Sequence, residues 1–311
     1  LRLEDESDSE PVICRVEFYR GAAATGKREK QMPVRQTVPA GIGVVVDRSV
    51  LLELPDGPYR FRAIRGPEYR IVSGTIDLEK TRLDEKTVAL PRMVNMADEG
   101  WLSGDCCIVP SSSSVPLRMA SEDLHVAAVL GDEHARPIPR RKADEPIQFA
   151  PLWIRTDARY DRGLVYYGID QADDAEAKNP FESLVEKASS ENTEVRVGIE
   201  NPFAWELPVW LASGKVDGMF IFGDWLRLDR RVLSVRDGRS EASFSLDEPT
   251  QVGRYAERIY RHVLDAGIPI VPLAGGGNQS AATPIGYNRM YVTTSRSDAY
   301  NNAYSVHDGF Q

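Results

Sequence analysis

The sequence predicts an α/β protein in which a small all-β sandwich precedes a larger β/α domain. From Val12 to Arg92, short runs typical of strands alternate with turn residues, as they do in small sandwiches. After Gly100, strand-like and helix-like segments alternate, which favours a parallel β/α arrangement. With 311 residues the chain is long enough for both parts.

Six runs in the first part have the apolar, β-branched or aromatic composition of strands. They cover residues 13–19, 43–46, 50–54, 59–64, 69–76 and 87–90. The turn Pro55-Asp56-Gly57-Pro58 is the clearest local signal between two of them. Residues 1–10 are acidic and poor in apolar side chains, so we expect a disordered tail there. These patterns divide the chain into a tail (1–10), a sandwich (11–97) and a β/α domain (98–311).

The second part contains eight candidate strands and four candidate helices. The strands are expected at 106–109, 126–130, 149–154, 164–167, 195–199, 219–222, 268–273 and 290–293. The helices are expected at 116–122, 181–189, 206–213 and 250–266. The last helix is the best defined, because its apolar residues recur at helical spacing and Gly267 can end it.

Composition limits the classes of function. The net charge of −9 argues against an extended nucleic-acid interface, which draws on clustered Lys and Arg. No apolar run approaches the roughly 20 residues of a membrane span. Three cysteines cannot form a disulfide framework, and we expect adjacent Cys106 and Cys107 to point to opposite faces of a strand. If the chain is a processed form, we expect it to be extracytoplasmic.

Four separated segments resemble one family in sequence order. They are 100–109 (Gly-Trp-Leu-Ser-Gly-Asp-Cys-Cys-Ile-Val), 121–127, 202–210 and 286–292. Together they resemble the CehA/McbA-like branch of the PHP (polymerase and histidinol phosphatase) metallohydrolases. The resemblance implies a distorted TIM-type β/α barrel. Segments 53–59 and 65–69 resemble the carboxypeptidase regulatory-like sandwich that commonly precedes it.

The opening strand of that family typically reads Gly-Asp-Leu-His-x-His, and Cys107 and Val109 occupy the two histidine positions here. In a β/α barrel, reactive groups gather at the carboxyl ends of the strands, where PHP enzymes hold two or three divalent ions. The residues at these ends that could supply a reduced, carboxylate-rich metal site are Asp105, Cys107, Asp132, Glu133, His134, Glu200 and Asp224. One zinc, manganese or iron ion is the cofactor such a site would hold. The alternative is that these acids are ordinary polar residues on loops.

Other polar residues suggest a place for a ligand. The glycine-rich segment 275–277 with Asn278 follows a strand, and its backbone N–H groups could approach an anion or simply form a turn. Asn288 and Arg289 stand in the retained segment 286–292, so we take Asn278, Asn288 and Arg289 as candidate ligand-binding residues. For His125 we expect a packing or hydrogen-bonding role rather than metal ligation.

Three functional hypotheses follow. The first is a divergent PHP-like protein that is catalytically inactive or altered, because the scaffold motifs persist while the histidine positions have changed. The second is an active one-metal hydrolase of ester, carbamate or phosphoester bonds. The third is an extracytoplasmic protein that binds a small molecule or carbohydrate. The sequence does not assign individual catalytic residues.

Overall fold

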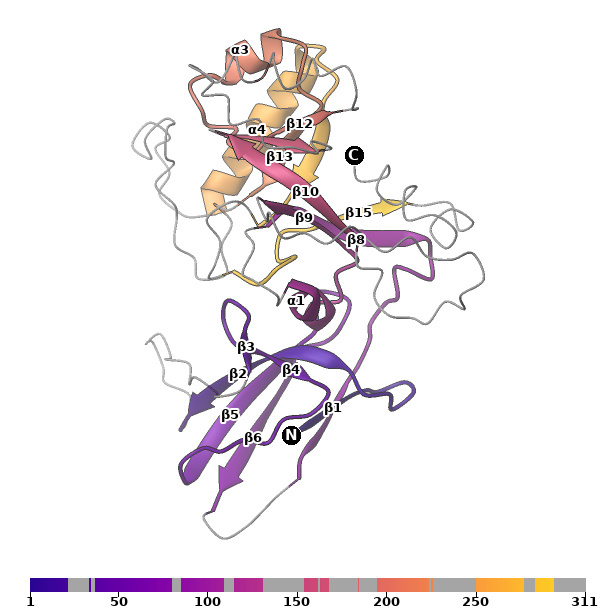
Figure 1. Ribbon diagram of the computed structural model, residues 1–311, viewed down its shortest axis with the longest axis vertical. Coiled ribbons are helices and arrows are strands. Elements are labelled where there is room, and N and C mark those ends of the chain that lie inside the picture. The colour runs from indigo at the N-terminus through magenta and orange to yellow at the C-terminus, as the bar shows by residue number, and fades with distance from the viewer. Residues whose placement is uncertain are drawn as a thin grey trace.

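The computed structural model describes residues 1–21, 34, 37–79, 85–108, 115–130, 154–161, 163–167, 184, 195–223, 225, 250–276 and 283–293. Figure 1 shows two lobes. The lower lobe consists of strands, and the upper lobe combines strands with the two helices α3 (Leu207–Ala212) and α4 (Thr250–Asp265). Helix α1 (Val115–Ser121) lies between the lobes.

The lower lobe is the expected sandwich. Its larger sheet has the order β3-β4-β2-β5-β6, with antiparallel neighbours throughout. The bounds are β2 (Ile13–Arg20), β3 (Val38–Pro39), β4 (Val44–Asp47), β5 (Gly57–Ile64) and β6 (Val72–Leu78). A second sheet pairs β1 (Arg2–Asp5) with β7 (Thr87–Leu90) in parallel. The apolar residues Cys14, Val16 and Phe18 alternate along β2 and point into the core between the sheets.

Two expectations for this lobe are wrong. Residues 1–10 are not a disordered tail, because Leu3 is buried in the core and β1 is paired with β7. The acidic composition did not indicate a strand, because β1 contributes only one side chain to the core. Asp5, on the same strand, is also buried, and its carboxylate accepts a hydrogen bond from the hydroxyl of Tyr69. Residues 50–54 form no strand, although Val50 and Leu52 do pack against the core.

The upper lobe is built on one eight-stranded sheet with the order β14-β13-β12-β11-β10-β9-β8-β15. The bounds are β8 (Trp101–Ile108), β9 (Val126–Leu130), β10 (Ile154–Asp161), β11 (Leu164–Tyr167), β12 (Arg196–Ile199), β13 (Gly218–Phe222), β14 (Val271–Ala274) and β15 (Met290–Thr293). Strands β8, β9 and β10 are parallel, as are β12, β13 and β14. Between the two groups β11 is antiparallel to both neighbours, and β15 is antiparallel to β8.

The prediction of a TIM-type β/α barrel is therefore wrong, because this sheet is open. Only two residues separate β10 from β11, and a parallel crossover needs a dozen or more. Gly163 in this connection has a φ of 101°, which suits a tight hairpin. At the other end, β15 pairs with the free edge of β8 from Trp101 to Gly104, where β14 would have to pair to close a barrel.

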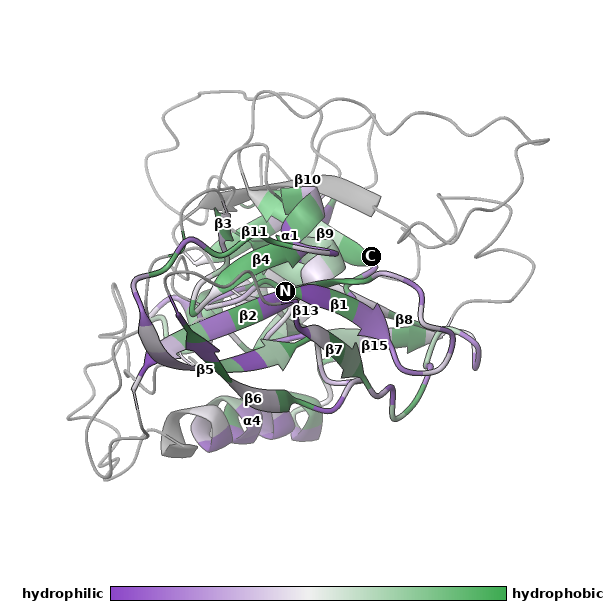
Figure 2. Ribbon diagram, turned by 90° about the horizontal axis from the view of Figure 1, so that it is seen from below, coloured by the Kyte–Doolittle hydropathy of each residue, from purple (hydrophilic) through white to green (hydrophobic). Residues whose placement is uncertain are grey.

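Residues 126–129 of β9 and all four residues of β11 are buried, so both faces of these strands are covered, which explains their nearly continuous apolar sequences. Figure 2 shows this as the hydrophobic colour of β9 and β11, whereas α4 carries both hydrophilic and hydrophobic positions. Helix α4 packs through Ala256 and Val263 and ends before Gly267, whose φ of 79° suits a helix C-terminus. Helix α1 contributes Val115 and Met119 to a cluster with β8 and β9. In the part of the chain that the structure describes, no helix has the length and apolarity of a membrane span.

Charged side chains join the two lobes. On β2, Arg15 and Glu17 point away from the sandwich core yet remain buried, because α1 packs across β2 and β4. Arg15 donates from Nε to Glu122 at 2.5 Å and from Nη1 to Glu17 at 2.8 Å. Glu122 directly follows α1, so this ion pair joins residues 107 positions apart in the chain.

Replacing Arg15 with Met should lower the free energy of unfolding by about 3 to 5 kcal/mol, since Glu122 would stay buried without its cation. Urea titration followed by circular dichroism measures the change. The control is Arg261→Met, which breaks the exposed pair of Arg261 with Glu257 and should cost less than about 1 kcal/mol. Equal effects of the two variants would contradict this account of the interface.

Candidate functional site

Asp105 links three separate segments through backbone hydrogen bonds. Its Oδ1 accepts the N–H of Cys107 at 3.1 Å and of Gly276 at 2.9 Å, and its Oδ2 accepts the N–H of Gly286 at 2.9 Å. The side chain is buried on β8, so both oxygens are directed at protein backbone. An ionised carboxylate has about four lone-pair positions, and these hydrogen bonds use three of them. Asp105 thus holds the segments after β14 and before β15 against β8.

Burial raises the pKa of Asp105 to about 7, although the three backbone N–H groups and Arg289 oppose the rise. Close packing accounts for the burial. A Cβ on Gly275 would lie 2.7 Å from the backbone N of Cys107 and 2.9 Å from Oδ1 of Asp105. Only glycine allows the chain to pass so near the carboxylate.

Cys107 is fully buried in an apolar cluster with Val165, Phe220 and Leu273. Cys106 belongs to the same cluster, and its Sγ contacts Sδ of Met290 at 3.2 Å. The expectation that adjacent cysteines alternate between faces assumes regular pairing, but the register of β8 with β9 shifts between Asp105 and Ile108. Burial raises the pKa of Cys106 to about 12, so this thiol stays protonated and unreactive at neutral pH.

Tyr167 is the central polar side chain of this region, and sequence reasoning missed it. Its hydroxyl donates to the carbonyl of Cys106 at 2.8 Å. Burial raises its pKa well above the usual value, and nearby Cys106, Cys107, Asp105 and Glu200 act in the same direction. The structure thus brings three candidate metal ligands near one buried phenol. The signal in the sequence was a tyrosine inside an apolar strand, since a buried tyrosine usually has a hydrogen-bond partner.

Glu200 is buried directly after β12, at the carboxyl end of that strand. This is the position in which the sequence placed a candidate ligand. Among the described residues, however, no three His, Cys, Asp or Glu side chains are grouped so that they could hold a metal ion. Val109, Asp132, Glu133, His134, Asp224 and Asn278 lie outside the described residues, so their part in a site stays a prediction.

Asn288 and Arg289 both contact the backbone of other segments. The amide of Asn288 donates to the carbonyls of Gly223 at 2.7 Å and Gly275 at 3.3 Å, which joins the ends of β13 and β14. The guanidinium of Arg289 donates to Gly286 O at 2.6 Å and to Glu122 O at 2.9 Å. These donors therefore hold protein segments in place.

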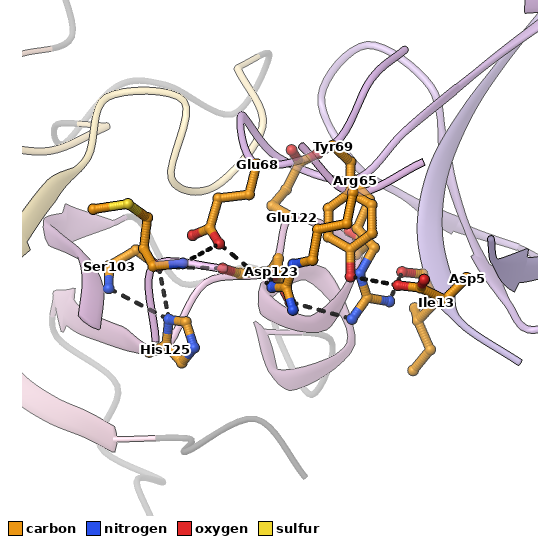
Figure 3. A network of polar contacts seen from close by, with 12 residues as sticks. Asp5, Ile13, Arg65, Glu68, Tyr69, Ser103, Glu122, Asp123 and His125 are labelled. Carbon is orange, nitrogen blue, oxygen red and sulfur yellow. Dashed lines mark hydrogen bonds and ion pairs between the residues drawn. The ribbon is translucent and has the colours of Figure 1, made fainter. Parts of the chain in front are cut away.

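A second polar cluster lies where the two lobes meet, with Asp123 at its centre (Figure 3). Asp123 has a φ of 52°, a conformation that Asp tolerates better than most residues. Its carboxylate accepts hydrogen bonds from Arg65 at 3.2 Å and from Arg92. Both guanidinium groups also lie over the ring of Tyr69, at 5.2 and 4.9 Å from its centroid. Burial alone would raise the pKa of Asp123, but these arginines outweigh it and lower the pKa.

His125 and Ser103 continue this cluster into the large sheet. Nδ1 of His125 lies 2.9 Å from Oγ of Ser103 and accepts the backbone N–H of Ser103 at 3.3 Å. The Ser103 hydroxyl also donates to the carbonyl of Asp123 at 3.1 Å. A nucleophilic serine must reach its substrate, whereas Ser103 is fully buried. The pair is structural, which confirms the hydrogen-bonding role expected for His125.

No family model, curated protein or solved structure matches this chain. The chemistry of the site is thus inferred from its own geometry and from the resemblance of its motifs.

Asp105→Asn should lower the free energy of unfolding by about 2 kcal/mol, because one carboxylate oxygen becomes an NH₂ group that faces a backbone N–H. Urea titration at neutral pH measures the loss. Asp98→Asn, on the exposed segment before β8, is the control and should change the value by less than about 0.5 kcal/mol. An unchanged stability of Asp105→Asn would contradict the linking role.

His125 should make the protein less stable in mild acid. Burial lowers the pKa of His125 below 6.5, with Asp123 opposing and Arg289 reinforcing this effect. At this site the unfolded chain therefore takes up a proton near pH 6.5 while the folded chain does not, and the contribution of His125 to stability falls as pH drops below that value. His125→Asn, which keeps an acceptor but cannot be protonated, should show a smaller loss between pH 7 and 5. The exposed His262→Asn is the control and should follow the parent protein.

Proposed function

We propose that this protein is a non-hydrolytic relative of the PHP metallohydrolases, whose first metal-binding strand has become structural. The observation that carries the proposal is the hydrogen bonding of Asp105. Both of its carboxylate oxygens accept backbone N–H groups, which come from three segments. Backbone thus takes three of the roughly four lone-pair positions of this buried carboxylate, which disfavours it as a metal ligand.

The other residues at the metal positions support the same proposal. Cys107 is fully buried and belongs to an apolar cluster, and Val109 has no side-chain atom that can bind a metal. The candidate ligand residues Asn288 and Arg289 donate to backbone carbonyls. Restoring histidine at positions 107 and 109 should not by itself create activity, because a histidine at 107 would enter an apolar cluster.

A second candidate is a one-metal hydrolase that uses Glu200. The observation in its favour is the position of this buried carboxylate, at the carboxyl end of β12, where its charge raises the pKa of Tyr167. Asp224 would be a further ligand. In this case a bound divalent ion would supply an activated water, and the chain's own part would be to hold that ion in a dry site.

For either candidate, we infer a small molecule or a carbohydrate as the ligand. A net charge of −9 disfavours nucleic acid as a partner. Extracytoplasmic binding of a carbohydrate without hydrolysis is a form of the non-hydrolytic proposal, and a glycan array would test it.

The deciding measurement is metal content together with turnover. The protein is purified without chelator, exposed separately to zinc, manganese and iron, and assayed on a panel of esters, carbamates and phosphoesters. We expect no metal-dependent hydrolysis and no stoichiometric metal under any of the three conditions. Matched variants are Glu200→Ala and the exposed Glu99→Ala. Metal-dependent hydrolysis with about one ion per chain, both lost in Glu200→Ala but kept in Glu99→Ala, would overturn the proposal in favour of the one-metal hydrolase.

A further inference from the structure

Strand β6 forms one edge of the five-stranded sheet. It pairs with β5 over its whole length, from Val72 opposite Ala63 to Leu78 opposite Gly57. Among the described residues, no backbone hydrogen bond reaches its other side. Within the described part of the chain, the outer side of these seven extended residues thus has no backbone partner, which makes it a template for another strand.

The two faces of β6 differ in chemistry. One face is polar and exposed, and it carries Ser73, Thr75 and Asp77. The other face turns toward the sandwich core, where Val72 and Ile76 pack against the core cluster but stay only half-buried. A further strand along this edge would complete the burial of these apolar side chains.

The register with β5 identifies the outward-pointing backbone groups. In an antiparallel pair, opposed residues alternate between exchanging two hydrogen bonds and exchanging none. Asp77 lies opposite Pro58, which has no N–H, so this position fits the non-bonded pair. Alternation then directs the backbone groups of Asp77, Thr75 and Ser73 outward, toward an incoming strand.

Strand β6 lacks the usual protection of an edge. Natural proteins place Lys or Pro on exposed edge strands, or keep them short. The opposite edge strand β3 is two residues long and contains Pro39. Strand β6 is seven residues long, contains no Lys, Arg or Pro, and has Asp77 as its one charged residue.

The sequence of β6 is complementary to itself. An antiparallel pair centred on Thr75 sets Thr75 opposite Thr75 and Ser73 opposite Asp77 on the polar face. On the apolar face it sets Val72 opposite Leu78 and Gly74 opposite Ile76. Each pair joins compatible chemistry, since hydroxyl faces hydroxyl or carboxylate and a bulky apolar residue faces a smaller one. The ring of Phe61 already covers Gly74, since a Cβ there would lie 2.6 Å from it, so Ile76 of the second copy would pack against this ring.

We propose that two copies of this chain associate through β6, which pairs with itself in antiparallel register about a two-fold axis at Thr75. The two five-stranded sheets then form one continuous ten-stranded sheet. A single strand pair buries less area than the roughly 1,600 Å² of a typical stable interface, so the dimer is weak and depends on protein concentration.

Sedimentation velocity over a concentration series tests the pairing and its register. Thr75→Lys places two ammonium groups opposite each other and should weaken the dimer about fivefold or more. Ser73→Lys places each lysine opposite Asp77 of the second copy and should strengthen it about fivefold. Thr75→Val is the control and should leave the dimer unchanged. All three changes are on the exposed face, so the fold is kept. A parent protein that is monomeric throughout, or a dimer that survives Thr75→Lys, would overturn the proposal.

Disulfide trapping gives a second test, which can detect even a weak dimer because the covalent bond accumulates. Paired residues that exchange hydrogen bonds have Cα atoms about 5.5 Å apart, within the range of a disulfide. Thr75→Cys should therefore cross-link under mild oxidation. Ser73→Cys should not, because residue 73 of one copy lies opposite residue 77, not residue 73, of the other. A mixture of Ser73→Cys and Asp77→Cys proteins should cross-link. The natural cysteines are buried and do not interfere. Equal cross-linking of Thr75→Cys and Ser73→Cys would show random collision and contradict the register.

Discussion

The structure depends on the burial of charge between its two lobes. Asp123 lies in the turn after α1 and binds Arg65 and Arg92 from the sandwich, while neighbouring Glu122 binds Arg15. Each of these charges is costly to bury alone, and the pairs offset that cost only when the lobes are in contact. The geometry of the large sheet is coupled to the same turn, because Ser103 on β8 donates to the carbonyl of Asp123.

This network also gives a physical reason why certain motifs persist in the sequence. Segments 121–127 and 286–292 resemble the PHP branch, segment 65–69 resembles the sandwich that commonly precedes it, and the three segments contact one another in the structure. Gly66 passes so close to Glu122 that a Cβ would lie 2.2 Å from its carbonyl oxygen. Arg289 donates to the same carbonyl, and Tyr291 donates to Glu68 at 3.3 Å. These segments thus join the two lobes.

Sequence patterns located most of the elements but not their topology. The strands at 126–130, 164–167 and 290–293 and the helix at 250–266 are confirmed nearly to the residue, because apolar periodicity reports local burial. Strand direction depends on connections, and the hairpin at Gly163 reversed β11 where a crossover was expected. A nearly continuous apolar strand has the same composition in an open sheet as in a barrel, so composition could not distinguish them.

The candidate site shows a similar limit. The sequence placed Asp105, Cys107 and Glu200 at strand ends; in the structure Glu200 directly follows β12, whereas Asp105 and Cys107 lie within β8. Their roles depend on the partner of each polar atom, and those partners come from distant glycines at 276 and 286. The pattern of side chains in a sequence does not show which backbone N–H groups will bind a carboxylate. A carboxylate that binds backbone and a carboxylate that binds metal therefore look the same in the sequence.

The pairing of Arg15 with Glu122 also has a consequence for synthesis on the ribosome. The strands of the sandwich have all emerged by Leu90, yet Arg15 on β2 meets Glu122 only when the turn after α1 follows. Until then Arg15 and Glu17 lie on an uncovered face of the sheet and remain hydrated. The first lobe thus reaches full stability only after the second has begun to fold, so the order of synthesis sets the order of assembly.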